Sequence, residues 1–476
     1  MRKILLIFLI FLFNTAFALD IVYPVRNQCT INAKSVFFIG NVGFEKELTI
    51  NSKPAKIWYG NIFVETFNLK EGVNTFVFRS DGETKTYTIT RPVSKKSSGG
   101  AVSSFHEFPD NAILYTKTID KRTPVRENTS NSARRVCDLP KDTVLFSVGK
   151  KAGFLKLYTS DKKELWVSEN ATDKRQSSFL SKITMSEVYS YRFYSDSYYD
   201  YIELHLSMPV LYTTDSDGKN IKVTLYGVEN RYNLEKTLYK QDSFDHLQVN
   251  QEGNNLVFYI NDKDDWGHLA GYQGNKFIFK RRKPPEPDKH LTLANVNILV
   301  DPGHGGSQLG SVGPTRVYEK DINLSIAYKL ISQLRRKGAN VYMSRTDDSD
   351  IGLYPRVDMA IENKAHFLIS IHANALGDGQ NPMERHGTSV YYYNENAKEL
   401  AQLIGKNLVS DTGLKDDGVN IGNFAVVRST MPISVLVETA YMIYPPEYVL
   451  LQNNAFQQLL ARSIADSIEA YVLSKR

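Results

Sequence analysis

The pattern of apolar and polar positions divides this chain near residue 295. From about residue 21 to residue 283, short apolar runs such as Val36–Ile39 and Thr75–Phe78 are separated by Gly, Pro, Asn and Asp turn signals. This alternation is typical of small antiparallel β domains. After residue 295, strand-like runs alternate with helical ones, which predicts an α/β domain with a mostly parallel, twisted sheet flanked by helices.

Within the α/β part, the elements can be placed by periodicity. Runs with four apolar residues in five predict buried strands at Val296–Val300, Phe367–Ile371 and Ile433–Val437. Apolar residues at helical spacing predict helices over residues 321–337, around residues 400–408 and over residues 456–472. We therefore expect three small all-β modules at the N-terminal side and one α/β domain after them.

The first residues indicate export. Arg2 and Lys3 precede the apolar run Ile4–Phe13, and Ala16–Ala18 supplies the small residues that signal peptidase requires. An uncleaved anchor is the alternative, but the run is short for a membrane span. We expect cleavage near Leu19, no stable membrane insertion afterwards, and a periplasmic, cell-envelope or extracellular location.

Composition narrows the partners. The net charge is +6, and Lys and Arg are spread along the chain rather than gathered in one stripe. This mild basicity suits a polyanionic partner such as a cell wall and does not favour nucleic-acid binding. An exported compartment would permit a disulfide between Cys29 and Cys137, although the sequence does not show whether they come within bonding distance.

Three residues with metal-binding side chains fall near predicted element ends in the α/β part. His304 follows the first strand, His372 ends a later one, and Glu319 lies at the start of the first helix. In open α/β sheets, ligands bind beyond the carboxyl ends of the strands, which is the edge these positions share. Two imidazoles and one carboxylate are the donor set of many catalytic zinc sites. The sequence thus predicts Zn²⁺ at this edge.

A second carboxylate, Glu438, ends another predicted strand at the same edge. Zinc lowers the pKa of bound water to about 7, and a neighbouring carboxylate can take the proton and later protonate a leaving amine. We therefore expect Glu438 to act as general base and acid in a hydrolysis.

The α/β part also carries motifs of a known family. They are Val300–Gly306, Glu319–Leu324, Ser344–Asp348, Arg356–Val357, Ser370–Ala375 and Val435–Glu438. With these motifs, residues 296–472 resemble the zinc-dependent N-acetylmuramoyl-L-alanine amidases. The resemblance implies zinc held by His304, Glu319 and His372, with Glu438 catalytic, and hydrolysis of the bond between N-acetylmuramic acid and L-alanine of the peptidoglycan stem peptide. It also implies supporting roles for Arg356 and Asn374.

Two departures from the family pattern bear on substrate and control. Thr439–Tyr444 follows Glu438 where the family commonly has Gly-Phe and a small polar stretch, which affects the shape of the substrate groove. The insertion between Asn374 and Gly387 is short, so the inhibitory helix of some relatives has little room there. Any restraint would come from the N-terminal modules or a partner, and an activator protein is unknown.

The β modules are predicted less specifically. Thr123–Glu127, Leu139–Leu145 and Glu164–Val167 resemble landmarks of bacterial SH3-like domains, and residues 180–283 resemble wall-targeting β domains that precede amidases. A tyrosine-rich cluster from Tyr189 to Tyr201 could stack on sugar rings or form a sheet surface or core. The expected organisation is a signal peptide at 1–18, a β-sandwich at 19–92, a linker at 93–110, an SH3-like module at 111–175, a wall-targeting-like module at 180–283, a linker at 284–294 and the zinc amidase domain at 295–475.

Alternative functions remain open. The same zinc site could serve another wall hydrolase, a peptidase or a deacetylase, or the chain could bind the wall without catalysis. Two other histidines have structural explanations: His366 starts a strand and suits packing or capping, and His386 suits a solvated loop.

Overall fold

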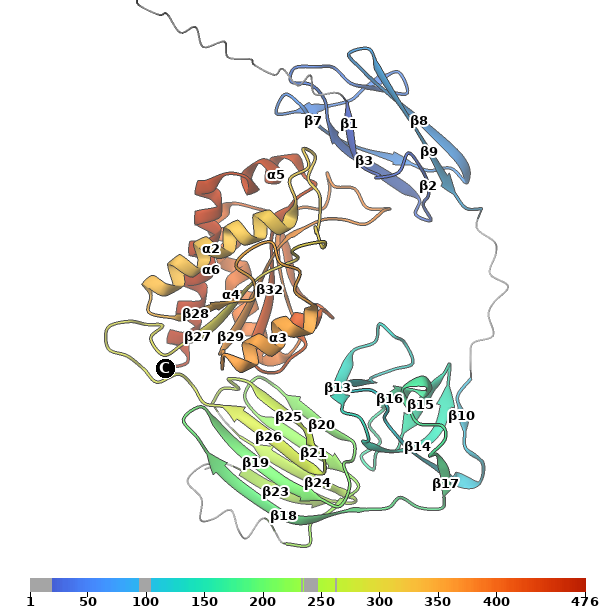
Figure 1. The fold of residues 1–476 in the computed structure, drawn as a ribbon, viewed down its shortest axis with the longest axis vertical. Helices are drawn as coiled ribbons and strands as arrows, with labels where there is room; N and C mark the ends of the chain where they lie inside the picture. The colour runs from blue at the N-terminus through green and yellow to red at the C-terminus, as the bar shows by residue number, and fades with distance from the viewer. Residues whose placement is uncertain (1–18, 94–103, 233, 235–246, 262) are drawn as a thin grey trace, which may run out of the picture.

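The computed structural model describes residues 19–93, 104–232, 234, 247–261 and 263–476. The expected signal peptide at residues 1–18 and the centre of the expected linker at 93–110 lie outside the described residues. Figure 1 shows three β-rich units and one α/β domain in chain order. In the described ranges, none of the helices has both the length and the apolar character that a membrane crossing needs.

The first β unit, residues 19–93, is a sandwich of two sheets. One sheet orders β1 (Asp20–Tyr23), β3 (Ser35–Asn41), β7 (Ile62–Asn68) and β6 (Ile57–Trp58); the other orders β2 (Gln28–Thr30), β9 (Glu83–Arg91), β8 (Gly72–Ser80), β4 (Thr49–Ile50) and β5 (Lys53–Pro54). Phe38 fills the space between the sheets, with ring centroids 5.0 Å from Phe76 and 4.9 Å from Phe78. The strands expected at Val36–Ile39 and Thr75–Phe78 are confirmed within β3 and β8.

The second β unit, residues 104–180, is one sheet of antiparallel pairs. Its order is β13 (Arg135–Leu139), β12 (Thr123–Arg126), β16 (Trp166–Ser168), β15 (Phe154–Leu157), β14 (Val144–Lys151), β11 (Ile113–Lys117) and β17 (Ser178–Leu180), and β10 (His106–Glu107) also pairs with β14. Short turns of 3₁₀-helix occupy η1 (Pro109–Asn111) and η2 (Glu169–Ala171). The end of the expected linker is therefore structured, because β10 finds hydrogen-bond partners along β14.

The third β unit, residues 181–283, again pairs two sheets. One orders β22 (Val228–Glu229), β18 (Ser186–Ser195), β19 (Tyr199–Leu206), β26 (Lys276–Arg282) and β25 (His268–Gln273); the other orders β20 (Tyr212–Ser216), β21 (Ile221–Tyr226), β24 (Asn255–Ile260) and β23 (Leu247–Glu252). In the tyrosine-rich cluster, Phe193 and Tyr199 are buried while Tyr189 is 60% exposed. The second and third units share one hydrophobic core, in which Val125 and Leu139 join Ile202 and Phe258.

The α/β domain is built on a six-stranded sheet. Its order is β28 (Asn340–Met343), β27 (Asn297–Pro302), β29 (Phe367–Asn374), β32 (Ile433–Tyr441), β30 (Thr388–Tyr392) and β31 (Asp416–Ile421). β30 runs antiparallel to β32, while the other pairings are parallel. The three predicted strands are confirmed, and each continues past its predicted end toward the edge that carries the candidate ligands.

Helices cover both faces of this sheet. They are α2 (Glu319–Arg336), α3 (Leu353–Glu362), α4 (Glu395–Thr412), α5 (Pro445–Leu451) and α6 (Asn454–Ser474), with a 3₁₀ turn at η4 (Ala425–Val427). Alternate strand residues separate the faces: Ile298 and Val300 pack in the core of α2, α4 and α6, whereas Leu299 packs with α3 and η4. The predicted helices are confirmed as α2, α4 and α6.

The β units dock on the α/β domain rather than standing apart from it. Phe37 and Val64 of the first unit belong to the hydrophobic core of the α/β domain, and Asn41 donates a hydrogen bond to the Pro314 carbonyl at 2.7 Å. Figure 1 shows the first unit near α5 and the third unit at the opposite end of the domain. Cys29 and Cys137 lie in different units, and each is a free thiol.

Candidate metal centre and catalytic cavity

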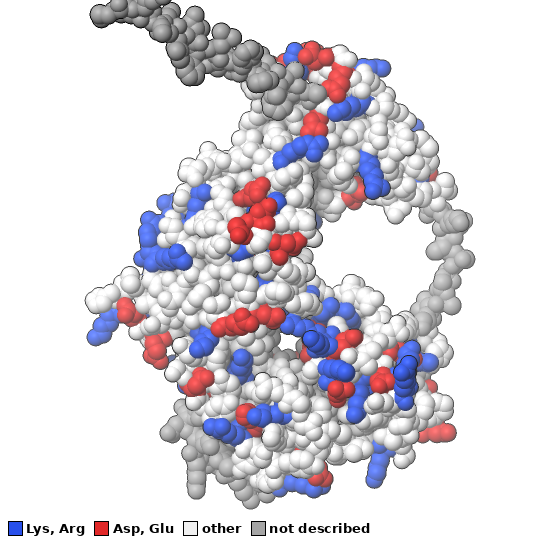
Figure 2. All heavy atoms as spheres, in the orientation of Figure 1, with Lys and Arg blue, Asp and Glu red and all other residues white. Residues whose placement is uncertain are grey.

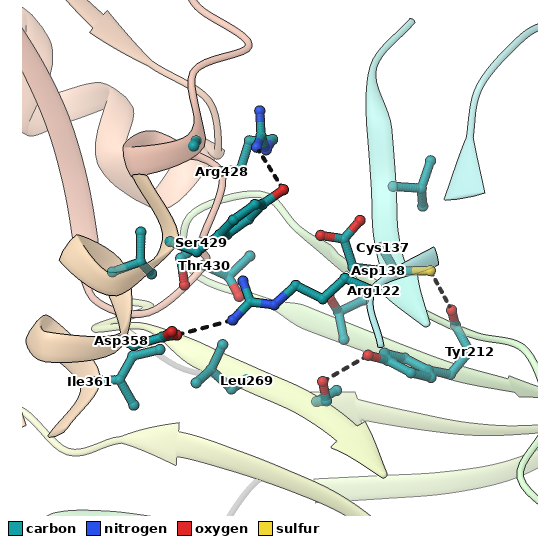
Figure 3. A pocket seen from close by; sticks show the side chains of 16 residues that line it. Arg122, Cys137, Asp138, Tyr212, Leu269, Asp358, Ile361, Arg428, Ser429 and Thr430 are labelled. Atoms are coloured by element: carbon teal, nitrogen blue, oxygen red, sulfur yellow. Dashed lines mark hydrogen bonds and ion pairs between the residues drawn. The ribbon is translucent and has the colours of Figure 1, made fainter. Parts of the chain in front are cut away.

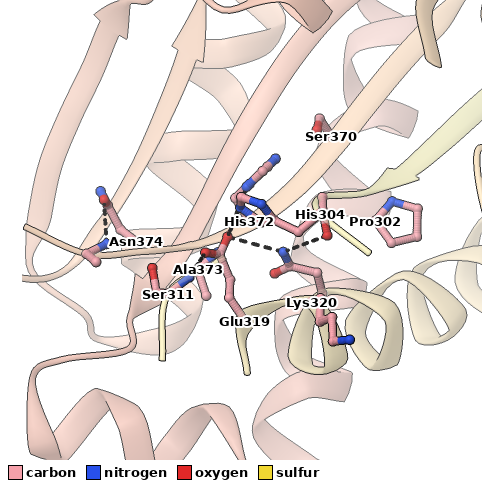
Figure 4. A network of polar contacts seen from close by, with 12 residues as sticks. Pro302, His304, Ser311, Glu319, Lys320, Ser370, His372, Ala373 and Asn374 are labelled. Carbon is pink, nitrogen blue, oxygen red and sulfur yellow. Dashed lines mark hydrogen bonds and ion pairs between the residues drawn. The ribbon is translucent and has the colours of Figure 1, made fainter. Parts of the chain in front are cut away.

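The structure brings the three predicted metal ligands together. β27 and β29 are parallel neighbours, so the loop after β27 and the end of β29 reach the same edge of the sheet. Glu319 is the first residue of α2, and its Oε1 lies 3.2 Å from His304 Nε2 and 3.0 Å from His372 Nδ1. The possible ligand atoms of these residues, called here the His–Glu–His cluster, all lie within 4.8 Å of one another. Figure 4 shows His304 and His372 converging on Glu319.

The carboxylate of the cluster is held from several sides. Ser311 N–H donates to Glu319 Oε2 at 2.7 Å, and Ala373 N–H donates to Oε1 at 3.2 Å. Burial alone would raise the pKa of Glu319, but its contacts with His304 and His372 hold this pKa well below its ordinary value. Burial likewise opposes protonation of His372, yet the Glu319 carboxylate keeps the pKa of His372 raised. Glu319 is therefore ionised at neutral pH.

Glu438 lies beside the cluster on the next strand. In the parallel register of β29 and β32 it is the direct neighbour of His372. Its Oε2 is buried and accepts no hydrogen bond within the described part of the chain. Burial, reinforced by the negative charges of Glu319 and Asp417 and opposed by His372, raises the pKa of Glu438 to about 8. A carboxyl group in this state can both accept and return a proton near neutral pH.

A buried ion pair fixes the loop that carries His304. Arg356 Nη1 donates to Asp301 Oδ1 at 2.6 Å, and Arg356 Nη2 donates to the His304 carbonyl at 2.8 Å. Ser344 and Ser370 donate to the two oxygens of Asp301 at 2.5 and 2.7 Å. These contacts hold His304 at φ 62°, a left-handed conformation that a non-glycine residue adopts only at a cost. Arg356 thus lies where a supporting residue was expected.

Asn374, the other expected supporting residue, lies apart from the cluster. Its Oδ1 accepts a hydrogen bond from the Ala375 N–H at 2.8 Å, and Figure 4 shows the side chain away from Glu319. Its backbone carbonyl accepts from the Met442 N–H at 2.9 Å, which ties the end of β29 to the segment after β32. The structure therefore gives Asn374 a position in the strand-end scaffold, and among the described residues its side chain makes no hydrogen bond to the cluster.

Close packing around the cluster involves residues that sequence reasoning did not single out. A Cβ at Gly310 would lie 2.5 Å from Glu319 Oε2 and 2.7 Å from His304 Cδ2. Arg345 donates from Nη2 to the carbonyls of Gly303 at 3.0 Å and Lys320 at 2.8 Å. No periodicity marks Gly310, whereas Arg345 lies within the family motif Ser344–Asp348 and was given no role of its own there.

The other two histidines serve different purposes. His366 is buried, as its packing role predicted, with Arg282 Nη2 3.0 Å from its Nε2. The expectation of a solvated His386 is wrong: its ring stacks on Tyr444 at 4.0 Å, and its Nδ1 lies 2.9 Å from Glu447 Oε1. The stack covers one face of the imidazole, and the carboxylate fixes its edge.

The cluster opens into a cavity of about 580 Å³, called here the strand-end cavity. His304, His372 and Glu438 form one side, and Leu353 of α3 with Phe424 beside η4 forms the other. Phe424 is 42% exposed, so an apolar rim faces the polar cluster. A cavity of this size with a few convergent polar groups suits a small portion of a larger substrate. The arrangement can hold a metal, bind an amide and move a proton.

A comparison with protein families matches the α/β domain of the chain. Residues 298–470 match the family model of N-acetylmuramoyl-L-alanine amidases. The chain is similar to the probable cell wall amidase LytH of Staphylococcus aureus, with 29% identity over 238 residues, which is 49% of this chain and 77% of that protein.

Solved structures similar to the chain also carry this description. One is an N-acetylmuramoyl-L-alanine amidase from Clostridium difficile 630, with 35% identity and a TM-score of 0.37, covering 39% of this chain and 100% of that one. Another is the catalytic domain of the amidase CwlV from Bacillus (Paenibacillus) polymyxa var. colistinus, with 36% identity and a TM-score of 0.35, covering 38% and 99%.

Proposed function

The chain belongs, through its C-terminal domain, to the N-acetylmuramoyl-L-alanine amidase family, and from this premise we propose that it is an exported zinc amidase of peptidoglycan. The bond cleaved joins the lactyl group of N-acetylmuramic acid to L-alanine of the stem peptide. The observation that carries this proposal is the convergence of His304, Glu319 and His372 in one cluster, beside a cavity that His304, His372 and Glu438 line. Peptidoglycan is the partner, and an activator is not identified.

The His–Glu–His cluster fits a catalytic zinc ion. Two imidazole nitrogens and one carboxylate oxygen make up a common three-ligand set that leaves a coordination position open for substrate or water. The candidate ligand atoms all lie within 4.8 Å of one another, so one ion could contact all three side chains. Bound zinc would supply Lewis acidity and positive charge, which polarise an amide carbonyl, acidify water and favour the carboxylate form of Glu438.

The residues of the chain divide the remaining work. As a water molecule attacks the carbonyl carbon, Glu438 Oε2 accepts its proton, because this oxygen has no competing hydrogen bond in the described residues. When the carbon–nitrogen bond breaks, Glu438 returns the proton to the leaving L-alanine nitrogen. The products are a glycan with a free lactyl carboxylate and an intact stem peptide.

The surrounding residues keep the ligands in place during this reaction. The Arg356–Asp301 pair holds the His304 loop, and Ser311 and Ala373 hold Glu319. Because these partners are supplied before substrate binds, the reacting groups need little reorganisation.

The test is digestion of purified peptidoglycan by the full chain, followed by mass spectrometry of the released fragments. We expect intact stem peptides that begin with L-alanine. Glu438→Gln should lower the rate by about 10²–10⁴-fold or more, because the proton transfer is lost, while zinc binding stays near that of the unsubstituted chain. Glu362→Gln, at an exposed position of α3, is the matched control and should leave the rate unchanged.

Each other product pattern would replace the proposal by a different function. Cleavage inside the stem peptide would indicate a peptidase, and release of acetate would indicate a deacetylase. Wall binding without any released fragment, by a zinc-loaded chain, would indicate a non-catalytic protein. Loss of zinc in the Glu438→Gln protein would assign that residue to the metal instead of the proton transfer.

A further inference from the structure

Guanidinium groups from two parts of the chain meet at Tyr354 of α3. Arg135 Nη1 from the second β unit and Arg428 Nη2 from the α/β domain each donate to the Tyr354 hydroxyl at 3.3 Å. Arg122, also from the second unit, lies over the Tyr354 ring at 4.4 Å and pairs with Asp358 at 3.0 Å. This meeting point is therefore shared by both domains.

Positive charge exceeds negative charge at this junction. The guanidinium groups gathered here belong to Arg122, Arg126, Arg134, Arg135 and Arg428. The carboxylates that pair with them belong to Glu127, Asp138 and Asp358. Figure 2 shows Lys and Arg concentrated where the α/β domain meets the second β unit. Crowded like charges destabilise one another unless an anion offsets them.

Arg428 forms no ion pair with a carboxylate among the described residues. Its hydrogen bonds, as far as the described residues show, go to neutral acceptors: the Asn423 carbonyl at 3.2 Å, the Asn423 side-chain oxygen at 3.3 Å and the Tyr354 hydroxyl. Burial lowers the pKa of Arg126, and the nearby charge of Arg135 lowers it further. An arginine side chain that lacks a paired carboxylate forms a strong, charge-assisted hydrogen bond with a carboxylate that enters the site.

The junction contains room for such a group. A cavity of about 280 Å³, called here the junction cavity, is lined by Arg122, Asp138 and Arg428 together with side chains of α3 and β25. Figure 3 shows Arg122 reaching toward Asp358 on one side of this cavity and Arg428 on another. Two carboxylates also line the cavity: Asp358 pairs with Arg122 at 3.0 Å, and Asp138 lies 3.6 Å from Arg135, so Arg428 is the lining arginine that neither of them pairs with.

The junction cavity is next to the strand-end cavity. Ala425 of η4 lines both, and α3 presents Leu353 and Arg356 to the strand-end cavity and Val357 to the junction cavity. A substrate chain that extends from the strand-end cavity past Ala425 would enter the junction cavity. In the proposed reaction, that chain is the stem peptide, which carries free carboxylates beyond its L-alanine.

We propose that the junction cavity is a subsite for the carboxylates of the stem peptide, with Arg428 and Arg122 as its anion-binding groups. This inference rests on the proposed amidase function and adds a role for the second β unit, which supplies Arg122 to the substrate site of the α/β domain. In this proposal the second β unit takes part in substrate recognition, and it is not only a neighbour of the α/β domain along the chain.

The test compares two soluble muramoyl peptides, one with free peptide carboxylates and one with each carboxylate converted to a carboxamide. With the unsubstituted chain, we expect amidation to raise KM by about tenfold or more, as the loss of a charge-assisted hydrogen bond predicts. With Arg428→Gln or Arg122→Gln, amidation should change KM by less than about threefold. Arg428→Lys keeps the charge and should retain most of the discrimination. Arg175→Gln, an exposed arginine that lines neither cavity, should behave as the unsubstituted chain.

A binding measurement separates this inference from the proposed function. Free stem peptide is titrated calorimetrically into the Glu438→Gln chain with and without Arg428→Gln. Weaker binding only when Arg428 is replaced supports the subsite even if hydrolysis is never observed. Equal sensitivity to amidation in the Arg428→Gln and unsubstituted chains, or equal binding of the free peptide by both Glu438→Gln proteins, would overturn the subsite and leave the amidase proposal intact.

Discussion

The two sides of the strand-end cavity are supported in different ways. On the cluster side, His304 and Glu319 are held by buried partners of the same domain, including the Asp301–Arg356 pair. On the other side, the wall made by α3 and η4 is contacted from outside by the second β unit, as in the pair of Arg122 with Asp358. Short-range buried contacts suit precise chemistry, whereas contacts between domains can adapt to different substrates.

Removal of the Arg356 side chain should have the largest effect on stability and on zinc binding by the His–Glu–His cluster. Arg356→Met leaves Asp301 buried without its cation, so we expect about 3–5 kcal/mol lower unfolding free energy and weaker zinc binding. Urea unfolding and zinc titration measure the two effects. The exposed Arg336→Met is the control. Because losing both charges costs less than losing one, the double variant with Asp301→Asn should regain much of the stability; a double variant no more stable than Arg356→Met would contradict the ion-pair explanation.

Gly310 tests how closely the cluster is packed. A Cβ at this position meets Glu319 and His304 and also requires φ 70°, so Gly310→Ala should weaken zinc binding by about 10–100-fold. Gly413→Ala, at φ 69° with open space around its Cβ, carries the same backbone cost without the contact. Competition with a zinc-binding dye gives both affinities. Equal affinities in the two proteins would mean that the packing around Gly310 does not position the ligands.

His366 makes the boundary with the third β unit sensitive to pH. Burial and then the charge of Arg282 hold the pKa of His366 well below its ordinary value near 6.5. Above pH 6.5 the ring is neutral in both folded and unfolded chains. As pH falls below 6.5, the unfolded chain takes up a proton that the folded chain refuses, so unfolding free energy falls by up to about 1.4 kcal/mol per pH unit.

Urea unfolding at pH 6.5 and 5.5 measures this slope. His366→Gln should flatten it, whereas His290→Gln, at an exposed position, should leave it unchanged. A slope that His366→Gln does not alter would locate the pH dependence in other groups.

Tyr393 provides the most local expected effect. Its hydroxyl accepts from the Arg135 N–H at 2.6 Å and donates to the Arg135 carbonyl at 3.0 Å, which ties β13 to the α/β domain. Tyr393→Phe should cost about 1–2 kcal/mol locally and speed amide hydrogen exchange at Arg135, with little change in zinc binding. Tyr342→Phe on β28 is the control. Unchanged exchange at Arg135 would show that other contacts suffice to dock the second unit.

The sequence predicted the positions of the cluster residues well because the strands that carry them can be recognised from short segments of sequence. Apolar runs predict the strands, and parallel strands bring their carboxyl ends to one edge of the sheet. His304, His372 and Glu438 could therefore be assigned to that edge from the sequence alone. The resemblance to a family added which side chains belong together. The exported location remains a prediction, because the expected signal peptide at residues 1–18 lies outside the described residues. The identity of the metal ion is a prediction as well.

Other features were decided only by tertiary structure. Asn374 shares its motif with His372 yet contacts Ala375, because side-chain direction depends on local packing as well as strand position. The meeting of Arg122 and Arg135 with Tyr354 joins residues more than two hundred positions apart. No periodicity encodes such a contact, since it arises when separately folded surfaces fit together. The sequence by itself thus determined the elements and the reactive edge, and the docking of the β units determined what surrounds that edge.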